Sequence, residues 1–140
     1  MPFTFFSHTG DVGVDIQSST LDGLFAAAAA ALAETLTDPT ALVPDTTVEI
    51  RLAAVEIDLL LHDWLCELLF RFDTSGFLPA GVVIEIDRDA GTWRLRAQVT
   101  GERTAASRLP IKALVKAVTY HALHVEEDGP GWRARVVLDV

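Results

Sequence analysis

Apolar and polar residues alternate along the chain with two periods, and each period predicts one kind of element. A period of two places successive side chains on opposite faces of a strand. This pattern occurs at 12–17, 47–54, 82–87, 92–99, 123–127 and 132–138. Residues 3–6 are expected to form a further short strand. A period near 3.6 gives a helix with one apolar face. It occurs from Leu21 to Leu36, at 56–73 and at 110–121.

The order of these elements predicts the fold class. Strands and helices mix without a regular strand–helix–strand alternation, and turn residues join 82–87 to 92–99 and 123–127 to 132–138 as hairpins. We therefore expect an α+β fold, a compact two-layer sandwich in which a largely antiparallel sheet packs against two or three helices. The helix at 56–73 has the widest apolar stripe, broadened by Leu59 and Phe70, so we expect it to be the most buried. Ser19 is the expected cap of the first helix.

Length and composition narrow the class of protein. The 140 residues suffice for one domain, over 1–140, and half of them are hydrophobic. No apolar run is long enough to cross a bilayer and no signal peptide is recognisable, so we expect a cytoplasmic protein. The single cysteine, Cys66, excludes an internal disulfide and a multi-cysteine zinc site. A net charge of −9 with only two lysines, Lys112 and Lys116, opposes direct nucleic-acid binding.

The central helix offers the first candidate chemistry. His62 and Cys66 stand four residues apart, a spacing that can present two metal ligands on one helix face. No third soft ligand is near in sequence, which favours cysteine as a small apolar residue. Asp58 and His62 are spaced as an i,i+4 pair, as are Glu67 and Arg71. The remaining histidines (His8, His121 and His124) suit either proton transfer or structural hydrogen bonds, and no nucleotide-binding loop motif occurs.

The two ends of the chain offer a second site. The opening loop S-H-T-G-D-V-G, residues 7–13, contains Asp11, and the final strand ends in Asp139 and Val140. If these ends meet, two side-chain carboxylates and the main-chain carboxylate of Val140 give three hard oxygen ligands. Such ligands suit Ca²⁺, Mg²⁺ or Mn²⁺, and without a cation they would repel one another. The alternative is that Asp11 is a turn residue and Asp139 is simply solvated.

Four stretches of the chain, taken together and in order, resemble the archease family. They are S-H-T-G-D-V-G, D-W-L-C-E-L-L-F-R-F-D, K-A-V-T-Y-H and the ending G-W-R-A-R-V-V-L-D-V. The resemblance runs from end to end. It implies a small α+β protein that is not itself an enzyme and activates an RtcB-type RNA ligase, which acts in tRNA splicing and RNA repair. The ligase forms a guanylylated histidine with GTP and Mn²⁺, and archease promotes that step and multiple turnover.

The resemblance also implies roles for particular residues. Asp11, Asp139 and Val140 would bind a divalent metal ion, calcium first with Mg or Mn as alternatives, and Gly10 and Gly13 would let the backbone bend around it. Lys116 would reach the ligase or its nucleotide, or else pair with a nearby carboxylate. His8 would orient Asp11 or contact the partner, or else hold the loop. The chain departs from the family at two positions. Gly10 stands where the family usually has alanine, and Ala122 stands where an acidic residue commonly follows the Y-H pair.

These features leave three functional hypotheses. The first is the ligase activator, whose acidic surface would suit transient docking on a basic RNA ligase. The second is a chaperone-like modulator of a tRNA methyltransferase. The third is a small metal-dependent hydrolase that uses Asp11 and Asp139, with His8 or His121 as the general base.

Overall fold

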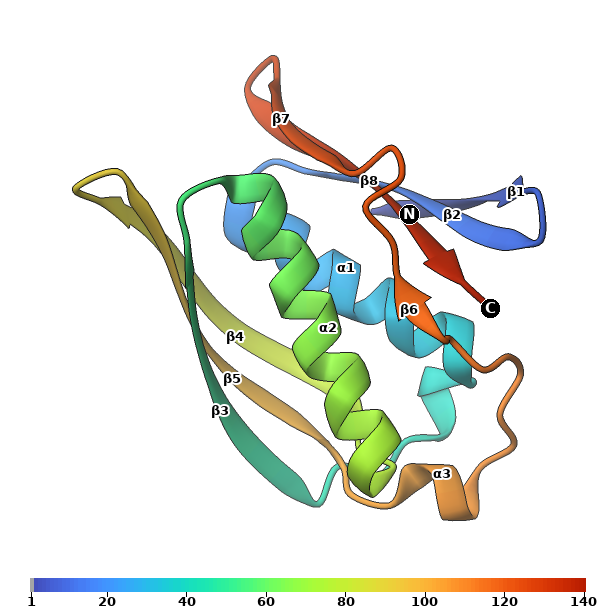
Figure 1. Ribbon diagram of the computed structural model, residues 1–140. Coiled ribbons are helices and arrows are strands. Elements are labelled where there is room, and N and C mark those ends of the chain that lie inside the picture. The colour runs from blue at the N-terminus through green and yellow to red at the C-terminus, as the bar shows by residue number, and fades with distance from the viewer. Residues whose placement is uncertain (1) are drawn as a thin grey trace.

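The computed structural model describes residues 2–140, which form three α-helices, one 3₁₀ turn and eight strands (Figure 1). The helices are α1 (Leu21–Leu36), α2 (Ile57–Ser75) and α3 (Ala105–Arg108), and the 3₁₀ turn is Pro39–Ala41. The strands are β1 (Phe3–His8), β2 (Asp11–Ser18), β3 (Thr46–Ala54), β4 (Leu78–Asp89), β5 (Thr92–Glu102), β6 (Ala117–Val118), β7 (His124–Asp128) and β8 (Gly131–Asp139). None of the described helices is long and apolar enough to cross a membrane.

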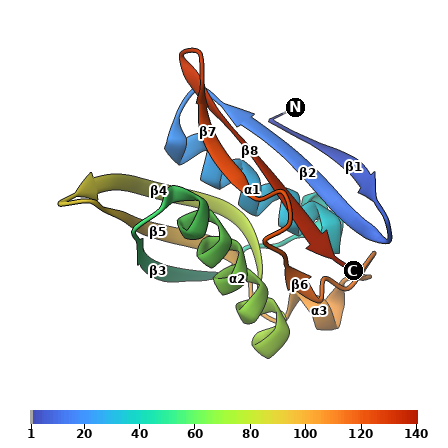
Figure 2. The ribbon, with the colours of Figure 1, turned by 45° about the horizontal axis from the view of Figure 1, so that its top comes forward.

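The strands form two antiparallel sheets, and α1 and α2 lie between them (Figure 2). In the five-stranded sheet the order is β1-β2-β8-β6, and β7 also pairs with β8. The three-stranded sheet has the order β3-β5-β4. The predicted α+β class and antiparallel pairing are therefore confirmed. The alternation of side chains predicted the strands but did not divide them between sheets, because a period of two says nothing about which strands pair.

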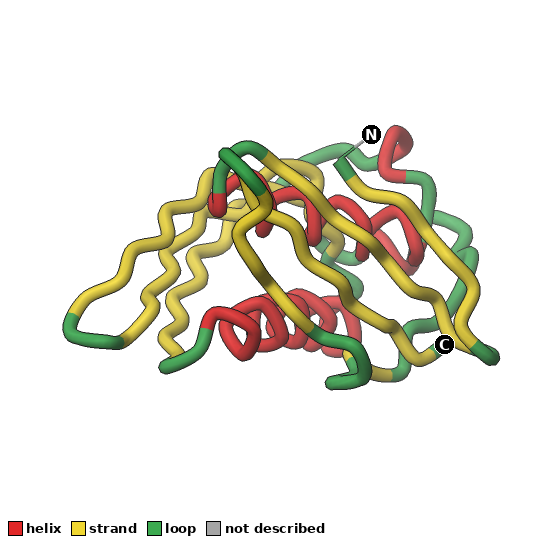
Figure 3. The backbone as a smooth tube through the Cα atoms, turned by 90° about the horizontal axis from the view of Figure 1, so that it is seen from above, coloured by secondary structure: helices red, strands yellow, loops and turns green. Residues whose placement is uncertain are grey.

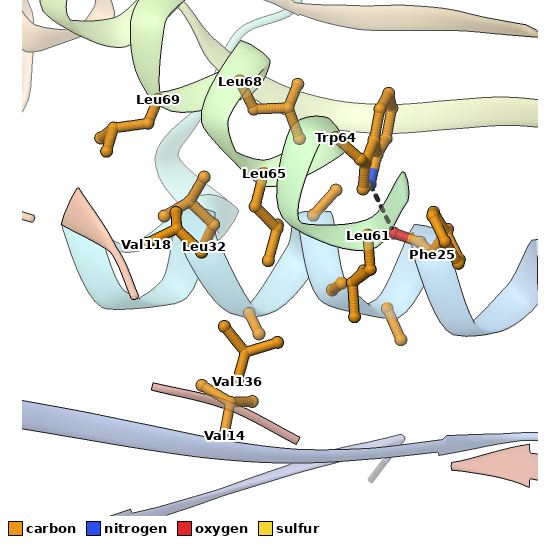
Figure 4. Close-up of a cluster of buried hydrophobic side chains, with 14 of the residues drawn as sticks. Val14, Phe25, Leu32, Leu61, Trp64, Leu65, Leu68, Leu69, Val118 and Val136 are labelled. Carbon is orange, nitrogen blue, oxygen red and sulfur yellow. Dashed lines mark hydrogen bonds between the residues drawn. The ribbon is translucent and has the colours of Figure 1, made fainter. Parts of the chain in front are cut away.

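The core lies where α1 and α2 pack against each other between the two sheets, and Figure 4 shows the part next to the five-stranded sheet. Trp64 of α2 is fully buried, and its indole Nε1–H donates to the Phe25 carbonyl of α1 at 2.9 Å. The expectation that α2 is the most buried helix is wrong. Ten of the 16 residues of α1 are buried, against eight of 19 in α2. Alanine side chains let α1 pack closely against both sheets, whereas Leu59 and Phe70 of α2 are exposed.

The N-cap of α1 is Thr20 rather than the predicted Ser19, and the Thr20 hydroxyl accepts from Gly23 N–H at 3.0 Å.

The predicted helix at 110–121 is absent from the structure. Residues 110–116 are irregular and are followed by the short strand β6. Their N–H groups are used by distant partners: Lys112 donates to the Leu36 carbonyl at the end of α1, at 2.8 Å. Satisfying the last carbonyls of α1 and pairing with β8 outweighs the local helical periodicity.

A carboxylate pair at one end of the five-stranded sheet

Strand register brings Asp11 and Asp139 face to face. They are direct partners in the antiparallel pairing of β2 with β8. Directly opposite residues share one face of a sheet, with Cβ atoms about 4.5–5.5 Å apart. Val140 follows Asp139, and Figures 2 and 3 show the C-terminus beside the turn that joins β1 to β2. We call Asp11, Asp139 and the carboxylate of Val140 the carboxylate tip.

Two further strands complete this end of the sheet. On one side, the backbone of His8 in β1 pairs with Asp11; the side chain of His8 lies outside the described part of the structure. On the other side, Ala117 of β6 pairs with Asp139, and Lys116 N–H donates to the Asp139 carbonyl at 2.7 Å. The structure therefore places His8 and Lys116, by their backbones, on either side of the two aspartates. Their roles stay predictions.

The turn before Asp11 consists of two residues, Thr9 and Gly10, with φ of 24° and 83°. Two positive φ values are typical of the turns that join paired strands with only two intervening residues. Glycine adopts such a conformation without steric cost, so Gly10 does bend the chain here. An alanine at this position would be strained by its φ angle even though no atom lies within 4 Å of the added Cβ.

Gly13 serves a different purpose from the one the resemblance implied. It lies inside β2, opposite Val137, and the ring of Phe6 lies over it. A Cβ on Gly13 would fall 2.1 Å from Phe6 Cζ, so the missing side chain makes room for the ring. Arg135 covers this ring, with its Cζ 4.5 Å from the ring centroid.

The arginine over Phe6 is itself held in place. Its Nε and Nη2 donate to the two carboxylate oxygens of Asp15, at 2.7 and 2.9 Å. This hydrogen-bonded pair raises the pKa of the Arg135 guanidinium. Next to the tip, therefore, the Phe6 ring is covered by Arg135, which is itself paired with Asp15. No local pattern in the sequence predicts this arrangement, because the cross-strand register decides which side chains meet.

The carboxylate tip has donors that suit a hard divalent cation. Within the described residues, His, Cys, Asp and Glu side chains form no group of three that could hold a metal ion. A cation at Asp11 and Asp139 would therefore take its third protein carboxylate from the main chain of Val140. Hard oxygen donors suit Ca²⁺, Mg²⁺ and Mn²⁺. Like charges placed directly opposite each other on a sheet are destabilising, and a bound cation would neutralise them.

The second candidate, His62 with Cys66, has the geometry of a packed structural pair. The Cys66 sulfur is nearly equidistant from Nδ1 and Nε2 of His62, at 3.6 and 3.7 Å. It therefore contacts the ring broadside, whereas two ligands of one metal ion would aim their lone pairs at a common point. His62 Nε2 lies 2.8 Å from the Val118 carbonyl. Burial, together with the charge of Asp63, raises the pKa of the Cys66 thiol, which disfavours the thiolate a metal requires.

Of the two predicted i,i+4 pairs on α2, one forms and in the other Asp58 has a different partner. Glu67 and Arg71 do form an ion pair, with Oε2 and Nε 3.0 Å apart. Asp58 instead accepts from Val125 N–H at 2.8 Å, which fastens β7 to the start of α2. His124 lies in β7, with Nδ1 3.1 Å from the Ala122 carbonyl, and pairs by register with Arg135 rather than with a tip residue.

Comparison with known proteins gives one consistent result. Residues 3–140 match the family described as "Archease protein family (MTH1598/TM1083)". A protein named archease from Methanopyrus kandleri is 36% identical over 141 residues, covering 100% of each chain. One from Methanosarcina barkeri is 31% identical and covers 99% of this chain and 95% of that protein.

Two solved structures are also similar. The solution structure of Methanobacterium thermoautotrophicum protein 1598 aligns with a TM-score of 0.88 at 29% identity, over 99% of each chain. A crystal structure described as an archease and possible chaperone from Thermotoga maritima aligns with a TM-score of 0.61 at 22% identity. It covers 96% of this chain and 94% of that one, and at that identity it supports the fold alone.

Proposed function

The chain belongs to the archease protein family, and we propose that it is a non-enzymatic activator of an RtcB-type RNA ligase. In this proposal the carboxylate tip binds a divalent cation and approaches the ligase during guanylylation. The observation that carries it is the pairing of Asp11 with Asp139, with Lys116 bonded to the same Asp139 through its backbone. Residues that the family resemblance singles out at the two ends of the chain thus meet at one end of one sheet.

Charge supports docking on an enzyme that binds RNA. The chain carries a net charge of −9, and a ligase that binds RNA and nucleotide presents a basic mouth. Opposite charge raises the rate of encounter and orients the partners. Lys116 adds a positive charge beside the tip, and its side chain is exposed. An exposed ammonium beside the tip would suit a phosphate of the nucleotide at the ligase active site.

The tip residues have separable tasks in this proposal. Asp11 and Asp139 supply oxygen ligands from two neighbouring strands, so the sheet fixes their spacing before any partner arrives. A bound divalent cation would supply Lewis-acid charge near a phosphoryl group. Lys116 is placed by the bond between its own N–H and the Asp139 carbonyl, at 2.7 Å, so its side chain starts from a defined position.

The test is RNA-ligase guanylylation measured over repeated turnovers with a cognate ligase. Wild-type protein would be compared with Asp11→Ala and with a chain extended beyond Val140. Glu49→Gln is a matched control, because Glu49 is an exposed carboxylate on the other sheet and pairs only with Arg51 among the ion pairs described. We expect stimulation by wild type and the control, and loss of it in both tip variants while circular dichroism shows them folded.

The opposite result would redirect the search for a partner. A ligase that shows no stimulation by wild-type protein would refute the activator proposal. Stable binding to a tRNA methyltransferase without any effect on RNA joining would then favour the chaperone-like alternative. Turnover of a phosphoester by the isolated protein would favour the hydrolase.

A further inference from the structure

Strand β6 is short, and it is held from both sides. It comprises only Ala117 and Val118. On the β8 side, Lys116 N–H donates to the Asp139 carbonyl at 2.7 Å and Thr119 N–H donates to the Val137 carbonyl at 3.0 Å. Successive residues of an antiparallel strand direct their backbone groups to opposite sides, and Thr119 directs its own toward β8. The carbonyl of Val118 therefore faces away from β8.

The group on that far side is the imidazole of His62, on α2. Its Nε2 lies 2.8 Å from the Val118 carbonyl oxygen. A carbonyl only accepts hydrogen bonds, so Nε2 carries the proton and acts as the donor. The bond is buried, since Val118 is 5% exposed and His62 is 7% exposed. A buried carbonyl that lost this donor would have no water to replace it.

The orientation of the His62 ring is fixed by its neighbours. Tyr120, two residues beyond Val118, stacks on the ring with centroids 4.0 Å apart and planes 15° apart. The Cys66 sulfur contacts the ring at 3.6 Å from Nδ1, and the Asp63 carboxylate lies 3.8 Å from the same nitrogen. The ring is thus held between α2 and the segment after β6, with Nε2 aimed at Val118.

We propose that His62 is a positioning residue for the carboxylate tip. Its Nε2–H bond to Val118 fastens β6 to α2 while β6 is paired with β8, and this sets the place of Lys116 beside Asp139. The link runs through three contacts: His62 to the Val118 carbonyl, β6 to β8, and Lys116 N–H to the Asp139 carbonyl. Its consequence for ligase activation rests on the proposed function, whereas its consequence for β6 does not.

A simple packing role for His62 makes a different prediction. If the ring only fills space in the core, removing its donor affects all parts of the fold alike. If it positions β6, the change is confined to the amides that join β6 to β8. Native-state hydrogen exchange separates these cases, because it reports the opening of individual hydrogen bonds.

The deciding experiment compares amide exchange in His62→Leu and His62→Gln. Leucine keeps apolar bulk but cannot donate, whereas the glutamine amide can donate from a position near that of Nε2. We expect the amides of Lys116 and Thr119 to exchange roughly tenfold faster in His62→Leu, as an orphaned buried carbonyl implies. In His62→Gln they should exchange nearly as in wild type. Amides within α1 should keep their rates in both variants.

Cys66→Ala is the matched control, because it removes another neighbour of the same ring and leaves the bond to Val118. It should leave exchange at Lys116 and Thr119 unchanged. Unchanged exchange of these two amides in His62→Leu would overturn the proposal. An equal rise across α1 and β6 would also overturn it, since His62 would then act only through global stability.

Ligase guanylylation then tests the functional consequence. We expect stimulation to fall in His62→Leu and to recover in His62→Gln, following the exchange of Lys116. Full stimulation by His62→Leu would refute the link to activation even if β6 were loosened. If wild-type protein failed to stimulate the ligase, the proposed function would fail, and the exchange data would still decide the positioning role.

Discussion

Substituting Gly13 by alanine tests the packing beside the carboxylate tip. The added Cβ would lie 2.1, 2.2 and 2.5 Å from three ring atoms of Phe6, so the whole ring must move. Overpacking of this kind costs about 1–3 kcal/mol. Loss of the Arg135 contact with the ring adds roughly 0.5–1 kcal/mol at a partly exposed site. Alanine returns about 0.4–1 kcal/mol by restricting the unfolded chain.

The expected net effect is a destabilisation of about 1–3 kcal/mol. For a domain of this size that corresponds to a fall in Tm of roughly 3–12 °C. Urea unfolding followed by tryptophan fluorescence gives the free energy, and the slope m shows whether the two-state description holds. The matched control is Phe6→Ala, in which the obstacle is gone.

A double-mutant cycle isolates the contact between the two residues. In the Phe6→Ala background, Gly13→Ala should be neutral or stabilising, because only the effect on the unfolded chain remains. The reasoning is refuted if Gly13→Ala is harmless in the wild-type background. It is refuted equally if the cost is the same in both backgrounds.

Three further predictions follow from other contacts. Glu102 is buried beside Arg108, and hydrogen bonds from Arg108 hold the pKa of the Glu102 carboxyl at about 2. This pair should therefore contribute stability above pH 4.5 that is lost as the pH falls toward 2. In urea unfolding at several pH values, Arg108→Met should weaken the dependence of the unfolding free energy on pH, and an unchanged dependence would contradict this reasoning. Calcium should raise the Tm of the wild-type protein, EDTA should reverse the rise, and the Tm of Asp11→Asn should not change. An equal shift of Tm in both proteins would place the ion elsewhere. Cys66, whose pKa is raised by burial, should react with a thiol reagent at pH 7 more slowly than free cysteine; an equal rate would show that its surroundings open readily.

Elements that depend on local pattern were predictable from the sequence. The strand expected at 47–54 is observed at Thr46–Ala54, and the helix expected at 56–73 at Ile57–Ser75. The segment 110–121 does not adopt the helix that its local pattern predicts. Its apolar residues have helical spacing, but its backbone groups are bound by α1, α2 and β8, and no local pattern reports those partners.

The candidate site was predictable only in its residues. Asp11 and Asp139 were predicted from the residues at the two ends of the chain and from the family resemblance, and the structure places them opposite each other, while their binding of a metal remains a proposal. The contacts around them were missed for one physical reason. Phe6 on Gly13 and His62 on Val118 are meetings between segments far apart in the chain, and they depend on strand register and helix placement rather than on spacing.

The pairing of β2 with β8 has a consequence for the protein's life in a cell. The sheet that holds the tip joins segments from opposite ends of the described chain, while the second sheet is made from the middle. If a protease cuts the chain anywhere between β2 and β8 and the two pieces separate, neither piece keeps both Asp11 and Asp139. A cut copy therefore loses the paired aspartates that the proposed function requires.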